Sequence, residues 1–127
     1  MSDARILIVD DNPSNLKLAA DLLEWAGYQI FKAADARQAL ESIQQTTPDL
    51  ILMDVALPGM DGLTLTRKLK AGEATKGIRI IALTSFAMKG DEQKAFDAGC
   101  DGYIAKPIDT RTLPDYVAEC LRKEMPS

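Results

Sequence analysis

DLILMD, residues 49–54, places four consecutive apolar residues between two acids. Pro48 precedes this stretch and Pro58-Gly59 follows shortly after it, so the apolar run is too short for an ordinary helix. We predict a strand that is buried on both faces, as in the middle of a parallel sheet. Its last residue, Asp54, then lies at the carboxyl end of a central strand, where open α/β sheets form their ligand crevice. Asp54 is therefore the candidate nucleophile.

The rest of the chain alternates short apolar runs with amphipathic segments. The runs predict further strands over residues 5–9, 28–33, 79–83 and 102–105. Caps and apolar stripes predict helices from Asn12 to Gly27, from Asp35 to Thr46, over 62–70, over 91–98, and from Asp109 or Thr110 onward. In the last helix, Pro114 is tolerated because it lies close to the first turn. The alternation predicts a single doubly wound α/β domain over residues 1–127, with a frayed tail at 124–127.

The bulk composition is that of an ordinary globular domain. Of 127 residues, 46% are hydrophobic and 27% are charged, which excludes a disordered or low-complexity chain. The net charge of −4 gives no indication of binding to DNA or to an anionic membrane surface. The amino terminus has neither the basic start nor the apolar run of a signal peptide, and no window reaches the length of a membrane span. We therefore expect a cytoplasmic protein whose partners are proteins, not DNA or membrane.

Two residue counts limit the chemistry. The chain has no histidine, which excludes a phosphohistidine carrier, a histidine-based acid–base enzyme and a histidine-ligated metal site. Cys100 and Cys120 are too few for a disulfide framework or a cysteine zinc site, and we interpret them as reduced core thiols. Any chemistry must therefore use carboxylates, hydroxyls and Lys106, with or without a hard cation.

Polar residues follow four of the five predicted strands. They are Asp10 and Asp11 after the first strand, Asp54 after the third, Thr84 after the fourth and Lys106 after the fifth. Because the carboxyl ends of parallel strands meet at one edge of a sheet, these side chains are expected to converge on one crevice. Three acids so close together repel one another, and an all-oxygen site open to water suits Mg²⁺. The sequence therefore predicts a magnesium site there.

A carboxylate beside Mg²⁺, a hydroxyl and a lysine can transfer a phosphoryl group. Asp54 would attack phosphorus and become an acyl phosphate. Mg²⁺ and Lys106 would neutralise the charge on the equatorial oxygens, and the Thr84 hydroxyl would hold one of these oxygens after transfer.

Five fragments resemble the receiver domains of two-component response regulators. In family order they are Val9-Asp10-Asp11-Asn12, Leu52-Met53-Asp54, Leu57-Pro58-Gly59-Met60-Asp61-Gly62, Ala82-Leu83-Thr84 and Tyr103-Ile104-Ala105-Lys106-Pro107, and together they cover nearly the whole chain. The stretch from Phe86 to Glu92 is most similar to single-domain regulators of the DivK and CheY-like type. The resemblance implies a flavodoxin-like, five-stranded parallel sheet in the order 2-1-3-4-5.

The resemblance also implies a role for each site residue. Asp54 would be the phosphoacceptor, Asp11 a direct Mg²⁺ ligand, Asp10 a ligand through water, and the Ala56 carbonyl a further ligand. Thr84 and Tyr103 would form a switch pair in which the hydroxyl moves toward the phosphoryl group and the aromatic ring turns inward. The Lys106-Pro107 peptide would be cis.

Partners follow from the same resemblance. The phosphoryl donor would be a phosphohistidine on a histidine kinase or a phosphotransfer protein, as in a phosphorelay. A downstream effector protein would bind the face formed by the last strand, its neighbouring helices and Tyr103. The chain would be a monomer or weak dimer and a signalling protein without enzymatic turnover, with self-dephosphorylation as a possible side activity.

Simpler interpretations exist for each residue taken alone. Asp10 and Asp11 could be acids favoured at a helix N-terminus, and Asp54 could cap its loop as an Asx turn. Thr84 could be a loop hydroxyl with its hydrogen bonds satisfied, and Tyr103 an aromatic without a switching role. Lys106 could form a structural ion pair with Asp54. Trp25, on the first helix, is interpreted as a packing residue, not a binding residue.

Three other functions compete with a phosphorylated switch. An aspartyl-nucleophile phosphatase needs a general acid two residues after the nucleophile, where this chain has Ala56. A flavodoxin-like FMN carrier could share the topology, but the loop after Val9 is acidic and would repel a phosphate. The third alternative is a receiver-like scaffold that acts by binding proteins without being phosphorylated.

Overall fold

The computed structural model describes residues 4–57, 61–84, 91–106 and 108–122. Its strands are β1 (Arg5–Val9), β2 (Gln29–Ala33), β3 (Leu50–Asp54), β4 (Arg79–Thr84) and β5 (Gly102–Ala105). All neighbouring strands are parallel, and the five-stranded sheet has the order β2-β1-β3-β4-β5. This confirms the predicted doubly wound sheet and its order.

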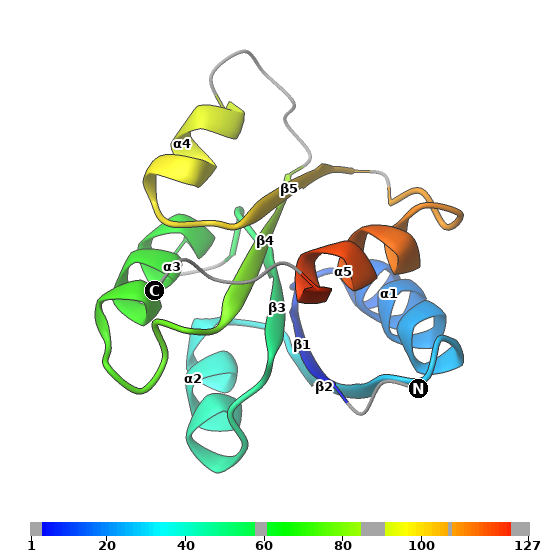
Figure 1. The fold of residues 1–127 in the computed structure, drawn as a ribbon, viewed down its shortest axis with the longest axis horizontal. Coiled ribbons are helices and arrows are strands. Elements are labelled where there is room, and N and C mark those ends of the chain that lie inside the picture. The colour runs from blue at the N-terminus through cyan, green and yellow to red at the C-terminus, as the bar shows by residue number, and fades with distance from the viewer. Residues whose placement is uncertain (1–3, 58–60, 85–90, 107, 123–127) are drawn as a thin grey trace.

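Helices cover both faces of the sheet (Figure 1). They are α1 (Pro13–Trp25), α2 (Ala36–Gln45), α3 (Gly62–Ala71), α4 (Asp91–Asp97) and α5 (Leu113–Arg122). α1 and α5 pack on one face, and α2, α3 and α4 pack on the other. In the part of the chain that the structure describes, none of these helices is long and apolar enough to cross a membrane.

The central strand β3 contributes to both layers of the core. Leu50 and Leu52 belong to the cluster under α1 and α5, whereas Ile51 and Met53 belong to the cluster under α2, α3 and α4. All four side chains are fully buried. This is the burial expected of a parallel strand with helices on both faces, and it explains why the run is continuously apolar.

Side-chain caps fix where three of the helices begin. The Asn12 side chain accepts hydrogen bonds from the N–H groups of Ser14 and Asn15 at the start of α1. Asp35 accepts from Gln38 N–H at 2.8 Å, and Asp61 accepts from Thr64 N–H at 2.8 Å. Such caps satisfy N–H groups that have no partner within the helix.

The last helix begins later than predicted. α5 starts at Leu113, and the backbone N–H groups of Thr112 and Leu113 both donate to the Asp109 carbonyl in a preceding turn. Asp109 Oδ1 closes this turn by accepting from Arg111 N–H at 2.9 Å. A helix begun at Asp109 or Thr110 would place Pro114 where a backbone N–H is required, which proline lacks. Starting at Leu113 puts Pro114 at the second position, where no N–H is required.

Trp25 is not a packing residue, and this prediction was wrong. Its side chain is 91% exposed, whereas Leu23, two positions earlier, is fully buried. Two helical positions differ by about 200° around the axis, so a residue two away from a buried one points to solvent. Ala26 is also exposed, because it follows the last turn of α1.

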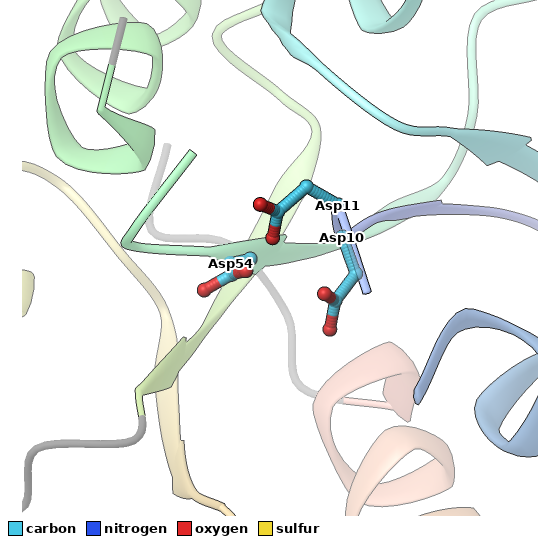
Figure 2. Close-up of side chains that lie close together, drawn as sticks. All are labelled: Asp10, Asp11 and Asp54. Atoms are coloured by element: carbon cyan, nitrogen blue, oxygen red, sulfur yellow. The ribbon is translucent and has the colours of Figure 1, made fainter. Parts of the chain in front are cut away.

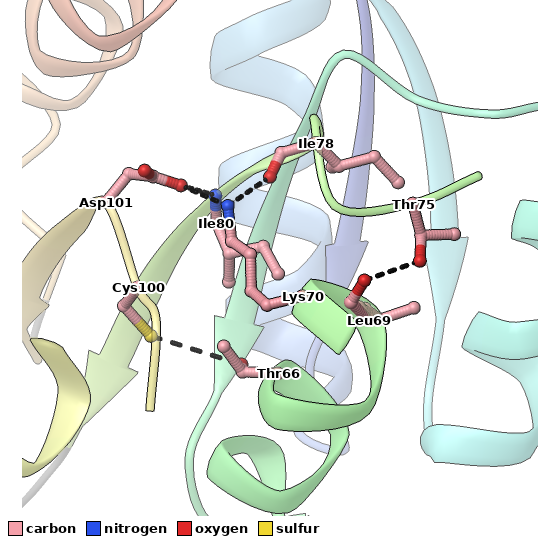
Figure 3. A network of polar contacts seen from close by, with 8 residues as sticks. All are labelled: Thr66, Leu69, Lys70, Thr75, Ile78, Ile80, Cys100 and Asp101. Atoms are coloured by element: carbon pink, nitrogen blue, oxygen red, sulfur yellow. Dashed lines mark hydrogen bonds and ion pairs between the residues drawn. The ribbon is translucent and has the colours of Figure 1, made fainter. Parts of the chain in front are cut away.

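A partly buried ion pair joins α3 to the start of β4 and the segment before β5 (Figure 3). Lys70 Nζ lies 2.9 Å from Asp101 Oδ2 and donates to the Ile78 carbonyl at 2.7 Å. The same Asp101 oxygen accepts from Ile80 N–H at 2.9 Å. Every group in this set has a partner, which is what makes a buried charge tolerable.

Both cysteines are free and buried, which confirms that they are core thiols. Cys100 Sγ lies 4.0 Å from the Thr66 hydroxyl, and burial raises the pKa of the Cys100 thiol. Three predictions concern residues outside those described: the cis peptide at Lys106-Pro107, the segment 86–90 and the frayed tail at 124–127.

Candidate functional site

Asp54 ends β3 and is only 3% exposed. Its Oδ1 accepts a hydrogen bond from Ala56 N–H at 3.1 Å, and its Oδ2 lies 3.4 Å from Lys106 Nζ. The Ala56 contact is the Asx-type contact expected of a simple capping residue. The burial of Asp54 and its contact with Lys106 are not explained by a capping role, because an acid that only caps a loop is normally exposed.

Asp10 and Asp11 follow β1, which pairs with β3 in the sheet. Asp10 is 1% exposed, and its Oδ1 accepts from Asn12 N–H at 2.9 Å. Its Oδ2 lies 2.9 Å from Lys106 Nζ, whereas Asp11 is exposed. Figure 2 shows these side chains close to Asp54 at the end of β3. The structure therefore brings together the acids that the strand ends predicted.

Lys106 is shared between two carboxylates. Its ammonium is closer to Asp10 than to Asp54, at 2.9 Å against 3.4 Å. Burial lowers the pKa of Lys106, but its close ionic contacts with the Asp10 and Asp54 carboxylates outweigh burial, and the net pKa is raised. Lys106 is therefore a firmly protonated cation. The preference for Asp10 was not predicted, because a sequence gives no distances.

The pKa of Asp54 is raised above its ordinary value. Burial is the main cause, and the negative charge of Asp10 adds to it. The Ala56 N–H and the Lys106 ammonium act in the opposite direction but do not outweigh burial. A cation bound beside Asp54 would favour its ionised form.

The acids fit a small divalent cation. One carboxylate oxygen from each of Asp10, Asp11 and Asp54 lies within 4.8 Å of the others. Ligands of an octahedral Mg²⁺ are about 3 to 4 Å apart, so small side-chain rotations would suffice to bind it. The buried Asp10 Oδ2 meets the Lys106 ammonium but has no well-formed hydrogen bond, which leaves it lone pairs for a metal or its water. Donor type and spacing therefore both suit Mg²⁺.

Thr84 and Lys106 lie at neighbouring strand ends of the same edge. Thr84 is buried at the end of β4, and its carbonyl accepts from Lys106 N–H at 2.7 Å. Tyr103, on β5, is half-buried and packs against the cluster under α2, α3 and α4. Ala56 is exposed beside Asp54. All the predicted site residues thus lie at or near the carboxyl edge of the sheet.

Gly62 is a residue of the site that the sequence did not single out. A Cβ atom on Gly62 would lie 2.1 Å from the Asp54 carbonyl oxygen and 2.9 Å from its carbonyl carbon. Gly62 N–H also donates to the Val55 carbonyl at 2.9 Å. The start of α3 therefore packs directly on the backbone of Asp54. The sequence places Gly62 in a receiver-like fragment and at the start of a predicted helix, but it gives no indication of this contact.

Comparisons with known proteins define the class. A family model described as the response regulator receiver domain matches residues 6–118. The polar-differentiation response regulator DivK of Brucella ovis is 42% identical over 118 residues, which are 90% of this chain and 96% of the Brucella protein. DivK of Brucella anthropi is 41% identical with the same coverage.

Solved structures agree with this class. A putative response regulator from Chloroflexus aurantiacus has a TM-score of 0.91 and 33% identity, covering 96% of this chain and all of its own. CheY4 of Vibrio cholerae has a TM-score of 0.87 and 29% identity, with 94% and 99% coverage. The receiver domain of the sensor histidine kinase PA1611 from Pseudomonas aeruginosa has a TM-score of 0.86 and 35% identity, with 96% and 100% coverage. Its structure contains a magnesium ion coordinated in the active site cleft.

The fold and its acidic edge define a receiver-type α/β domain of two-component signalling. The chain belongs to the response regulator receiver domain family.

Proposed function

We propose that this chain is a phosphorylatable signalling switch whose phosphoacceptor is Asp54. The observation that supports this most directly is the position of Asp54: it is buried beside a protonated lysine and within reach of two further acids. A buried carboxylate in such surroundings is poorly placed to stabilise the fold and well placed for phosphoryl chemistry.

The transfer step uses this chain's own groups. An Asp54 carboxylate oxygen attacks phosphorus while the bond between phosphorus and the imidazole nitrogen of a phosphohistidine donor breaks, and the imidazole keeps the electron pair. The Lys106 ammonium, which already lies near both carboxylates, neutralises charge on the phosphoryl oxygens. Asp10, Asp11, Asp54 and the Ala56 carbonyl would hold Mg²⁺, which supplies further charge neutralisation when bound.

Thr84 and Tyr103 would carry the signal from the site. The Thr84 hydroxyl would hold a phosphoryl oxygen after transfer, and the Tyr103 ring would then turn inward. Tyr103 is half-buried on the edge strand, so its ring forms part of the surface there. Ring rotation would change the surface around β5 that an effector protein binds.

The partners are proteins: a histidine kinase or phosphotransfer protein as donor, and a downstream effector. The protein would act in the cytoplasm as a monomer or weak dimer, without binding DNA or membrane directly. It would not turn over substrates, because the position of a general acid two residues after Asp54 is occupied by Ala56. Any self-dephosphorylation would use water without such an acid.

The test is phosphorylation by a small phosphodonor such as acetyl phosphate with Mg²⁺, followed by intact mass. Wild type should gain one phosphoryl group and Asp54→Asn none. Asp49→Asn, at the opposite end of β3, is the matched control and should be phosphorylated like wild type. If wild type gains no phosphoryl group, or Asp54→Asn gains one equally, the proposal is wrong. A scaffold that binds proteins without phosphorylation would then be the better description.

A further inference from the structure

The Tyr116 hydroxyl accepts a hydrogen bond from the backbone N–H of Tyr103 at 2.9 Å. Tyr116 lies on α5 and Tyr103 lies on β5, the edge strand of the sheet. The bond therefore joins a helix to the strand that carries the proposed switch residue. Neither the phosphoryl chemistry nor the metal ligands described above involve Tyr116.

The Tyr103 N–H faces the outer edge of the sheet. Lys106 N–H donates to the Thr84 carbonyl across the β4–β5 pair. Because successive amides along a strand point to opposite sides, the N–H three residues earlier points away from β4. A backbone N–H at a half-buried edge needs a partner, and the Tyr116 hydroxyl is that partner.

Gly102 makes room for this contact. A Cβ atom on Gly102 would lie 2.7 Å from the Tyr116 hydroxyl oxygen and 3.0 Å from its ring atom Cε1. Any side chain at position 102 would thus push the Tyr116 ring away from β5. The glycine beside Tyr103 and the tyrosine on α5 therefore depend on each other.

The two tyrosines pack on opposite faces of the sheet. The Tyr103 ring contacts the cluster under α2, α3 and α4, and the Tyr116 ring contacts the cluster under α1 and α5. A cavity of about 160 Å³ adjoins the Tyr116 ring and is also lined by Ile104 and Leu113. The Tyr116 ring therefore borders open space next to α5 and β5 instead of being enclosed by the core on every side.

We propose that Tyr116 is a positioning residue that ties the resting backbone of Tyr103 to α5, so that reorientation of Tyr103 and displacement of α5 occur together. This rests on the proposed function, in which Tyr103 is the switch. Coupling of this kind is reciprocal. A protein partner that binds α5 and holds Tyr116 against β5 favours the unphosphorylated arrangement. A partner that binds α5 when the hydrogen bond between Tyr116 and Tyr103 is broken favours the phosphorylated arrangement.

The first test is amide hydrogen exchange of Tyr103 in unphosphorylated Tyr116→Phe protein. The Tyr103 amide should exchange about tenfold faster than in wild type, the effect of losing one hydrogen bond of ordinary strength. Tyr28→Phe is the matched control: Tyr28 packs on the same cluster, and its hydroxyl has no hydrogen bond to the described residues. Unchanged exchange in Tyr116→Phe overturns the proposal.

The second test measures coupling. On phosphorylation of wild type, exchange should change at Tyr103 and in α5 together. Tyr116→Phe and Gly102→Ala should also gain one phosphoryl group by intact mass. In both variants, however, the change in α5 amide exchange on phosphorylation should be less than half of the change in wild type. An α5 response as large as in wild type overturns the proposal.

The two proposals fail separately. If wild type takes up no phosphoryl group, the proposed function is wrong, and the role of Tyr116 is then decided by the nuclear magnetic resonance signals of the Tyr103 ring. These signals should shift in Tyr116→Phe and stay unchanged in Tyr28→Phe. Unshifted signals in Tyr116→Phe overturn the role of Tyr116.

Discussion

The surroundings of Asp54 favour its neutral form, whereas its proposed reaction requires the ionised form. Burial raises its pKa, and the neighbouring Asp10 raises it further, although the acid must be ionised to attack phosphorus. The Lys106 ammonium offsets only part of this cost because it lies closer to Asp10. Without a divalent cation, the ionised form of Asp54 therefore destabilises the fold.

This predicts that Asp54→Asn is more stable than wild type at neutral pH without divalent ions. An acid whose pKa is raised on folding binds its proton more tightly in the folded state, so stability falls as pH rises from the unfolded pKa through the folded one. Above that pH range, burying the ionised Asp54 carboxylate lowers the stability by its full amount, and the neutral amide of the Asp54→Asn variant removes this cost. We expect the melting temperature to rise by about 2–5 °C, as for roughly 1 kcal/mol in a domain of this size.

Thermal unfolding in a chelator-containing buffer measures this effect. Asp49→Asn, which replaces an exposed acid at the other end of β3, should unfold like wild type. An Asp54→Asn protein that melts at or below the wild-type temperature at neutral pH would show that Lys106 fully compensates the buried charge.

At the scale of elements, the contact of α3 with β3 fixes the backbone of the phosphoacceptor. Gly62 begins α3, and a Cβ atom there would lie 2.1 Å from the Asp54 carbonyl oxygen. Main-chain atoms cannot move aside as the end of a flexible side chain can. A substitution at Gly62 must therefore shift either the helix or the strand end.

We predict that Gly62→Ala costs about 2–3 kcal/mol of unfolding free energy, as for other overpacked sites. It should also slow phosphorylation of Asp54, because the acid moves with its backbone. Gly77→Ala is the control: a Cβ there meets nothing within 4 Å, so the change should stay within about 0.5 kcal/mol. Urea unfolding measures both variants, and equal stabilities would contradict the contact at Gly62.

For the whole molecule, the sheet could be predicted because its pattern is local. Buried parallel strands appear as continuous apolar runs, and four of the five strands end on or are followed by a polar residue. The strands and the convergence of Asp10, Asp54 and Lys106 on one edge therefore followed from the sequence. Helix caps such as Asn12 also act through near neighbours in the chain. These features need no knowledge of distant contacts.

Two features of the site were missed because they depend on contacts between distant segments. Lys106 prefers Asp10 to Asp54 by a fraction of an ångström, and Gly62 is required because of the Asp54 carbonyl. The start of α5 was missed at short range, because it depends on the local turn that Asp109 closes. Trp25 was misplaced for a local reason, since an apolar residue was assumed to be buried although its helical position points to solvent.

The whole domain should be stabilised by Mg²⁺ in a pH-dependent manner. A cation that binds only the folded acid cluster adds RT ln(1 + [Mg²⁺]/Kd), about 2.7 kcal/mol at a hundredfold excess over Kd. Protonation of Asp54 removes one ligand of the cation. Because the pKa of Asp54 is raised above 3.8, the stabilisation by Mg²⁺ should begin to decline at a higher pH than it would with an ordinary aspartate.

Melting temperatures with Mg²⁺ and with chelator, compared from pH 7.5 down to 4.5, provide the measurement. The melting temperature of wild type should rise clearly with Mg²⁺ at pH 7.5, and this rise should become smaller as the pH is lowered. In chelator, acidification over the same range should lower the melting temperature of wild type less than that of Asp54→Asn. Asp10→Asn should weaken the Mg²⁺ effect at neutral pH, because it removes a buried carboxylate of the cluster. If Mg²⁺ raises the melting temperature equally at pH 7.5 and pH 4.5, or equally in wild type and Asp10→Asn, the cation binds elsewhere on the surface.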